Sequence, residues 1–199
     1  NSQYVFDVQT PSEILTDIRF SLPGTHNLMN ALMALAMAKT YGVATDDIRK
    51  ALASFKGIRR RFSFQIKTDD LVFIDDYAHH PTEINAVHQA VRELYPNQKV
   101  LAIFQPHLFS RTKDFADGFA QSLSAFDEVI LLDIYPAREL PMEGITSQWL
   151  MEKMTNPNVK LVSKTDLISN ILKSEARVIV TIGAGDIGEL VKPIKEALR

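Results

Sequence analysis

The densest group of reactive side chains lies at residues 75–83, which read Asp-Asp-Tyr-Ala-His-His-Pro-Thr-Glu. The carboxylates, phenol and imidazoles of this segment can all bind ligands or exchange protons. The apolar run 71–74 before it predicts a buried strand, and apolar residues recur at helical spacing after Pro81. The segment is therefore expected to join a strand end to a helix start, where backbone N–H groups attract anions. We interpret it as part of a ligand site.

The elements that position this segment are predicted from the spacing of apolar residues. Residues 4–21 are expected to be rich in strand, and helices are expected at 27–41 and 46–55. From residue 62 onward, short apolar strands alternate with amphipathic helices, which predicts βαβ units. The expected strands are 62–67, 71–75, 99–104, 128–133, 159–162 and 177–182, and the expected helices are 82–95, 112–125, 146–154, 165–173 and 186–198. We therefore expect an α/β fold with a Rossmann-like, mostly parallel, doubly wound sheet.

In such a sheet, ligands bind beyond the carboxyl ends of the strands. Polar clusters follow the expected strands at 75–80, 105–112, 133–139 and 183–186. Because the carboxyl ends of parallel strands share one edge of the sheet, we expect these four loops to converge there.

The expected helix 27–41 is apolar nearly all round, which predicts burial on several sides. Asn27 and Asn30 share one face of it, and a buried carboxamide needs a hydrogen-bond partner. The edge of an adenine ring offers an acceptor and a donor that suit asparagine. Capping of the helix by Thr25 is the alternative; we favour a ligand.

A glycine and three arginines at 57–61 interrupt the pattern and predict a domain boundary after about residue 57. Arg59, Arg60 and Arg61 would ordinarily form a solvated charged run. At a boundary between domains, one of these guanidinium groups is a candidate for clamping phosphate oxygens.

Two further motifs have competing interpretations. His79 and His80, together with Asp75, Asp76 and His107, suggest a metal site, but adjacent histidines point apart and the set is underdetermined. We expect these histidines to position a ligand and expect no metal ligands in the chain.

The run Gly-Ala-Gly-Asp-Ile-Gly at 183–188 matches a dinucleotide fingerprint, and an NAD-dependent oxidoreductase is the corresponding alternative. Only 11 residues follow the run, so no second strand completes the unit. We expect the glycines to allow a tight turn between a strand and a helix instead.

The composition excludes some classes of function. The chain has 199 residues, 46% of them hydrophobic, with a net charge of −2 and no cysteine. These values indicate a globular protein without disulfides or thiolate metal sites, and they argue against a nucleic-acid partner. No apolar run is long enough to span a membrane and no signal peptide opens the chain, so we expect a cytoplasmic protein without a membrane partner.

Five motifs, in their order and spacing, resemble the Mur ligase family. They are Gly-Thr-His-Asn-x-x-Asn at 24–30, Gly-Ile-Arg-Arg-Arg-Phe at 57–62, the segment 75–83, Phe-Gln-Pro-His at 104–107 and Gly-Ala-Gly at 183–185. The chain is most similar to the branch that joins L-alanine to UDP-N-acetylmuramate. The resemblance covers essentially the whole chain. It implies that residues 1–57 end a central ATP-binding domain and that residues 58–199 form the amino-acid-binding C-terminal domain.

The resemblance implies an ATP-dependent ligase of peptidoglycan precursor synthesis that works through an acyl phosphate. The residues implied to bind ATP are His26, Asn27, Asn30, Arg61 and Asp76. Those implied to position the substrate amino acid are Tyr77, His79, His107 and Arg111. Of these, Arg61, Asp76 and His79 are the implied catalytic residues.

The chain departs from the family pattern in two places. No Gly-x-x-x-x-Gly-Lys-Ser/Thr loop occurs in it. ATP and Mg²⁺ are therefore expected to be bound mainly by parts outside the chain, which is expected to be inactive alone. Leu108 stands where the family often has arginine, and Arg138 is a candidate substitute. The alternatives are a related ligase that adds a tripeptide and a non-catalytic nucleotide-binding module; Tyr77 favours the alanine enzyme.

Overall fold

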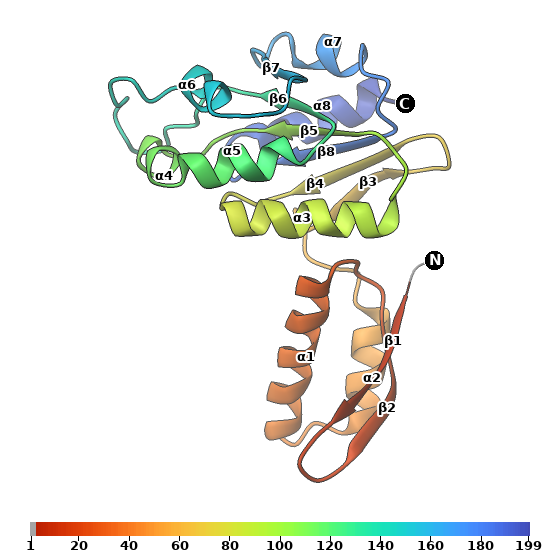
Figure 1. Ribbon diagram of the computed structural model, residues 1–199. Helices are drawn as coiled ribbons and strands as arrows, with labels where there is room; N and C mark the ends of the chain where they lie inside the picture. Colours follow the sequence, from red (N-terminus) through yellow and green to blue (C-terminus); the bar gives the residue numbers. More distant parts are fainter. Residues whose placement is uncertain (1–2) are drawn as a thin grey trace.

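The computed structural model describes residues 3–199, which form a small hairpin–helix unit below a larger α/β unit (Figure 1). In the smaller unit, β1 (Tyr4–Gln9) pairs antiparallel with β2 (Ile14–Phe20) and is followed by α1 (Thr25–Thr40) and α2 (Thr45–Ser54). A small apolar core holds these elements together. Its buried members are Leu15, Ile18, Leu35 and Ile48.

The α/β unit is built on a six-stranded sheet in the order β3-β4-β8-β5-β6-β7. The strands are β3 (Ser63–Lys67), β4 (Val72–Asp76), β5 (Val100–Phe104), β6 (Glu128–Leu131), β7 (Val159–Leu161) and β8 (Val178–Ile182). Only β3, at the edge, is antiparallel to its neighbour. The last strand, β8, lies between β4 and β5. The predicted mostly parallel sheet is confirmed.

Helices cover both faces of this sheet. The helices are α3 (Pro81–Leu94), α4 (Phe109–Asp114), α5 (Ala116–Ser124), α6 (Ser147–Glu152), α7 (Leu167–Ile171) and α8 (Ile187–Ala197). Successive side chains of a strand face opposite sides, so β5 directs Ala102 toward the core shared with α3 and α5, and Ile103 toward the core shared with α7 and α8. This arrangement is the expected doubly wound fold.

Two expectations about helices are wrong. The single helix predicted at 112–125 is two helices, α4 and α5, separated at Phe115, whose φ of −113° and ψ of 19° are not helical. The Phe115 ring packs edge-on against His80, with 4.6 Å between ring centroids. This contact with the start of α3 fixes the chain where the helix breaks.

The second wrong expectation concerns α1, which is not buried on several sides within the described residues. Only Ala31 and Leu35 of this helix are buried. Met29, Met33 and Met37 are 52%, 60% and 61% exposed. They recur every four residues and so form one stripe, on the side of α1 that faces away from the hairpin and α2. An apolar sequence shows that a helix can pack against other elements on several sides, but it does not show that those elements are present.

Residues 55–62 connect the two units without helix or strand. Gly57, Arg60 and Phe62 have positive φ angles of 89°, 60° and 48°. For the two non-glycine residues this conformation is costly and persists only where surrounding contacts hold it. Here the Phe62 side chain is buried in the core of the sheet, and the Arg60 carbonyl accepts the N–H of Tyr77 at 2.8 Å. The connection is therefore a defined hinge.

None of the helices within residues 3–199 is both long and apolar enough to cross a bilayer.

Candidate functional site

A cavity of about 650 Å³ lies between the hairpin–helix unit and α3. The residues expected to contact a nucleotide all line it, although they come from α1, the hinge and β4. These residues are His26, Asn27, Asn30, Arg61 and Asp76. The volume falls within the range of about 300–1,000 Å³ that is typical of small-molecule sites. The structure thus brings together residues that lie up to 50 positions apart in the sequence.

One wall of this cavity is apolar. Phe20 and Phe55 stack with 6.4 Å between ring centroids and an interplanar angle of 12°. Ile58 of the hinge also lines the cavity and is 65% exposed, and Val87 of α3 contributes to the opposite side. An exposed aliphatic side chain beside an aromatic pair is suited to cover a flat heterocycle.

Gly24 allows the start of α1 to approach α3 closely. Its φ is 91°, and a Cβ atom there would lie 2.9 Å from the Cβ of Ala90 and 2.8 Å from Cε1 of His26. Only glycine fits such a contact without a shift of its neighbours. The turn therefore places His26 and Asn27 at the mouth of the cavity.

The polar groups of α1 differ in how free they are to bind a ligand. The Asn27 amide donates to the Pro23 carbonyl at 2.7 Å, so its Oδ1 atom is the group available as an acceptor. Asn30 is exposed, so the expectation that burial forces it to find a partner is wrong. Burial, with the charge of Arg61, lowers the pKa of His26 and favours its neutral ring. The helix has no side-chain cap, and its N-cap residue is Gly24, so Thr25 does not serve as one.

Asp76 fastens the hinge to the end of β4. Its carboxylate is 4% exposed and accepts the N–H groups of Phe62 and Ala78, each at 2.7 Å. Burial raises the pKa of Asp76 to about 6, although these two hydrogen bonds and the charge of Arg61 act in the opposite direction. A carboxylate at the cavity wall that is only partly compensated is a good acceptor for hydroxyl donors of a ligand.

Arg60, the second arginine of the run, uses its guanidinium group for hydrogen bonds within the protein. Its Nε donates to Asp75 Oδ2 at 3.1 Å and its Nη2 donates to the Gly183 carbonyl at 2.7 Å. Asp75 also accepts from the Thr181 hydroxyl at 2.9 Å. These contacts tie the hinge to β4 and to the loop after β8, so Arg60 has a structural role that the sequence did not reveal.

Arg61 faces the cavity instead. Its nearest carboxylate is Glu83, with 3.6 Å from Nη1 to Oε1, and its side chain is 49% exposed. Glu83 is held by the His79 N–H, which donates to its other oxygen at 2.8 Å. Burial would raise the pKa of Glu83, but this hydrogen bond, His79 and Arg61 together lower it. The carboxylate therefore stays charged. Among the three arginines, Arg61 is the one placed to bind an anion in the cavity.

The residues expected to position an amino acid form a second group, beside the first. The Tyr77 and His79 rings lie 5.4 Å apart between centroids, and His79 and His107 lie 6.4 Å apart. Arg111 Nη1 is 3.4 Å from Nδ1 of His107. Burial lowers the pKa of His107, and the positive charge of Arg111 adds to that effect. The loops after β4 and β5 thus converge at one edge of the sheet, as expected.

Tyr135 belongs to this second group, although no role for it was predicted from the sequence. Its ring stacks on His107 at 5.6 Å between centroids, and the two residues form a parallel β-bridge. The Leu108 N–H donates to the Tyr135 carbonyl at 2.9 Å. The feature of the sequence that could have identified Tyr135 is its position just beyond β6, at the same sheet edge as His107.

The loop at 183–188 makes a tight turn, as the glycines predicted. Gly183 has a φ of 147°, and a Cβ atom there would lie 2.9 Å from the carbonyl oxygen of Gln105. The Gln105 side chain accepts the N–H of Ile187 at 2.9 Å and donates to Asp186 at 2.7 Å. Gln105 and Tyr135 fill the space over the loop, which argues against dinucleotide binding there.

No three metal-ligating side chains converge anywhere in residues 3–199. The metal site considered for the paired histidines is therefore not supported. His80 caps α3 instead, because its Nδ1 accepts the N–H of Thr82 at 3.3 Å.

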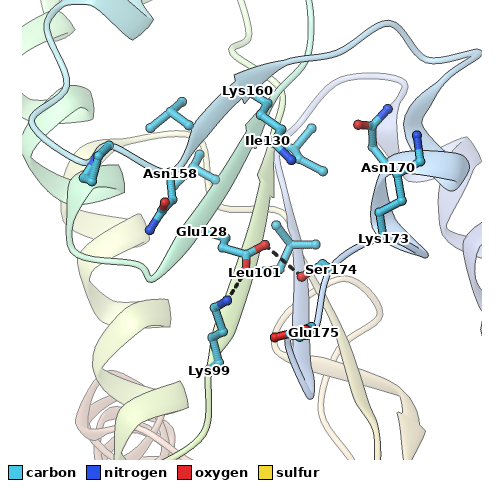
Figure 2. A pocket seen from close by; sticks show the side chains of 13 residues that line it. Lys99, Leu101, Glu128, Ile130, Asn158, Lys160, Asn170, Lys173, Ser174 and Glu175 are labelled. Atoms are coloured by element: carbon cyan, nitrogen blue, oxygen red, sulfur yellow. Dashed lines mark hydrogen bonds and ion pairs between the residues drawn. The ribbon is translucent and has the colours of Figure 1, made fainter.

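A second cavity, of about 300 Å³, lies at the opposite, amino edge of the sheet (Figure 2). Two of its charged side chains pair with each other. Lys99 Nζ lies 2.6 Å from Glu128 Oε1, and the Ser174 hydroxyl donates to Glu128 Oε2 at 2.8 Å. The Lys99–Glu128 pair is therefore satisfied within the protein, whereas the residues expected to contact a nucleotide line the cavity between the units.

Comparison with known proteins shows similarity over essentially the whole chain. The family described as "Mur ligase, glutamate ligase domain" matches residues 60–185. UDP-N-acetylmuramate--L-alanine ligase of Flavobacterium johnsoniae is 76% identical over 198 residues, which cover 100% of this chain and 44% of that protein. The chain thus spans less than half the length of this relative.

Solved structures show the same similarity. The crystal structure of UDP-N-acetylmuramate-alanine ligase MurC from Thermotoga maritima superposes with a TM-score of 0.75 at 26% identity and covers 93% of this chain and 42% of that one. A murein peptide ligase from Psychrobacter arcticus superposes with a TM-score of 0.65, also at 26% identity, and covers 94% of this chain and 39% of that one.

Proposed function

The chain belongs to the Mur ligase family, and from that premise we propose that it is part of an ATP-dependent ligase that joins L-alanine to UDP-N-acetylmuramate. Such an enzyme supplies a peptidoglycan precursor. The observation that carries the proposal is the cavity between the two units, which gathers the five residues expected to contact ATP. In this assignment residues 1–57 end the central ATP-binding domain, and residues 58–199 are the C-terminal domain.

The cavity suits ATP as a substrate. Phe20, Phe55 and Ile58 would cover the base, and Asn27 offers an amide oxygen to its amino group. Asp76 would accept from a ribose hydroxyl. Arg61, beside Glu83 at the cavity wall, would donate to phosphate oxygens, for which a planar guanidinium is well shaped.

The second group would hold L-alanine. Arg111 would bind its carboxylate, beside the rings of Tyr77, His79, His107 and Tyr135. In the proposed reaction the carboxylate of UDP-N-acetylmuramate takes the γ-phosphoryl group of ATP, and the amine of L-alanine then displaces phosphate. The amine must lose a proton to react, and His107, with its lowered pKa, is a neutral acceptor at neutral pH.

The described residues do not supply every part that this reaction needs. Residues 3–199 have no cluster that fits Mg²⁺, and the sequence contains no Gly-x-x-x-x-Gly-Lys-Ser/Thr loop. We therefore assign no step to Mg²⁺ and propose that the 199-residue chain does not catalyse the reaction alone. Phosphate release by the purified chain with ATP, L-alanine and UDP-N-acetylmuramate would contradict this.

The alanine enzyme is favoured over the tripeptide-adding one. The Flavobacterium johnsoniae relative carries the name of the alanine ligase, and the Thermotoga maritima structure superposes better than the peptide ligase at equal identity. Tyr77, which is expected to narrow the second group, supports the same choice.

Calorimetry with a non-hydrolysable ATP analogue tests the nucleotide site. We expect saturable binding to the wild-type chain, weakened about tenfold or more by Arg61→Ala, because a charged hydrogen bond contributes about 1.5–3 kcal/mol. Arg59→Ala is the matched control, since Arg59 is exposed and does not line the cavity. Equal affinities of the two variants would overturn the assignment of Arg61 to the phosphates of ATP.

A further inference from the structure

We propose that Tyr4 is a positioning residue for the cavity between the units. Its hydroxyl closes a clasp between the Gly24 turn and α3, and this clasp sets the spacing of the two cavity walls. The identity of the ligand rests on the function proposed above, whereas the clasp itself does not.

The clasp consists of two hydrogen bonds to one hydroxyl. Tyr4 Oη accepts the N–H of Gly24 at 2.9 Å and donates to Oε1 of Glu93. Tyr4 lies on β1 in the hairpin–helix unit, and Glu93 lies on α3 in the α/β unit. Because the same oxygen is both acceptor and donor, it joins the turn to the helix through a single atom.

The protonated phenol is maintained by its surroundings. Burial raises the pKa of Tyr4, and its hydrogen bond to Glu93 acts in the same direction. The hydroxyl therefore remains a donor throughout the neutral pH range.

Each partner of the hydroxyl is continuous with one wall of the cavity. Gly24 is followed by His26 and Asn27 on the first wall. Glu93 is on the same helix as Glu83, ten residues or roughly 15 Å further along its axis. The clasp thus holds α3 at the end distant from the cavity, while the hinge holds the chain near the cavity itself.

The contact of Gly24 with Ala90 shows why a fixed spacing matters. A Cβ atom on Gly24 would lie 2.9 Å from the Ala90 Cβ, so the turn already packs closely against α3. Packing of this kind resists compression but not separation, since separation only breaks weak contacts. The Tyr4–Glu93 hydrogen bond supplies the directional restraint that opposes separation.

The absence of cysteine from the chain allows a direct distance measurement. Lys50 and Lys192, whose side chains are 80% and 85% exposed, are on opposite units and accept spin labels after replacement by cysteine. We expect Tyr4→Phe and Glu93→Ala to lengthen and broaden the label distance distribution. The double variant should be no broader than either single variant, because both remove the same bond. Tyr41→Phe, at a tyrosine that is 86% exposed, is the control and should match the wild type.

A second measurement separates the clasp from the proposed ligand. If the cavity binds ATP, Tyr4→Phe should weaken binding of the ATP analogue about three- to tenfold, because the two walls are no longer held at the spacing that the ligand needs. Circular dichroism of each variant establishes that it is folded. An unchanged distance distribution in folded Tyr4→Phe would overturn the clasp. A broadened distribution, together with equal affinities of Arg61→Ala and Arg59→Ala for the ATP analogue, would leave the clasp standing and overturn the proposed nucleotide site.

Discussion

Asp127 and Asp76 lie at opposite edges of the same sheet and differ in how their charge is compensated. At the amino edge, Asp127 accepts from Arg92 Nη2 at 2.6 Å and from the Val100 N–H at 2.8 Å. Burial would raise its pKa, but these donors together lower it. At the carboxyl edge, Asp76 accepts only backbone N–H groups, and burial raises its pKa to about 6.

This difference indicates that charged groups at the amino edge of the sheet stabilise the fold, whereas charged groups at the carboxyl edge are available to a ligand. At the amino edge, the charge of Glu128 is also compensated within the protein, since Lys99 forms an ion pair with it and the Ser174 hydroxyl donates to it (Figure 2). The carboxyl edge holds Asp76 and Arg61 beside a cavity, where a ligand can complete their interactions. Asp186 is an exception at this edge, because it pairs with Lys164 and Gln105 and serves the turn rather than the cavity.

The largest expected effect concerns the pH dependence of stability at the carboxyl edge. Because the folded pKa of Asp76 is about 6 and the ordinary pKa of an aspartate is 3.8, its contribution to stability is complete below about pH 4 and lost as pH rises through 6. The loss corresponds to about 3 kcal/mol. Urea denaturation should show that the destabilisation caused by Asp76→Asn is larger at pH 4 than at pH 7. If Asp76→Asn destabilises the protein equally at pH 4 and at pH 7, the proposed difference between the two edges of the sheet is wrong.

A smaller effect is expected from backbone strain at the same edge. Gly183→Ala should lower the free energy of unfolding by about 2 kcal/mol, because φ is strained and the new Cβ meets the Gln105 carbonyl. Gly144→Ala is the matched control. Its φ of 75° is also positive, but no atom lies within 4 Å of the added Cβ, so about 1 kcal/mol of strain should remain. Thermal denaturation of both variants measures the difference. Equal losses would show that the loop can move away from Gln105.

The smallest effect is expected at the amino edge. Asp127→Asn should cost about 1 kcal/mol, since its side chain is 38% exposed and solvent weakens the ion pair. The lowered pKa of Asp127 means that this cost is present at pH 7 and disappears as pH falls below its ordinary range, the reverse of Asp76. Affinity for the ATP analogue should be unchanged. Weaker binding of the ATP analogue to Asp127→Asn would show that the amino edge of the sheet also contributes to the shape of the cavity.

The sequence was sufficient for the parts of the fold that depend on local pattern. The apolar run within 99–104 and the helical spacing in 82–95 predicted β5 and α3 to within about one residue, because each places one or both faces in a core. The convergence of His79 with His107 also followed, since it needs only the rule that parallel strands end at one edge.

Contacts that depend on individual side chains of distant segments were beyond prediction. The exposed stripe at Met29, Met33 and Met37 depends on what covers α1, and the break at Phe115 depends on a ring contact with another loop. The different roles of Arg60 and Arg61 depend on which guanidinium reaches Gly183 across the sheet. Neighbouring residues of the same type give no local signal that distinguishes such roles.

The place of β8 in the sheet has a consequence for how the chain folds during synthesis. β4 and β5 never pair with each other, because residues 178–182 lie between them and pair with both. A nascent chain that has emerged only to β7 therefore has two separate sheet pieces, and the hydrophobic rows of β4 and β5 lack a shared neighbour. Closing the sheet requires joining strands about 100 residues apart, which is slow and follows release of the last strand from the ribosome. Until then, exposed strand edges make the growing chain prone to aggregation and a candidate for chaperone binding.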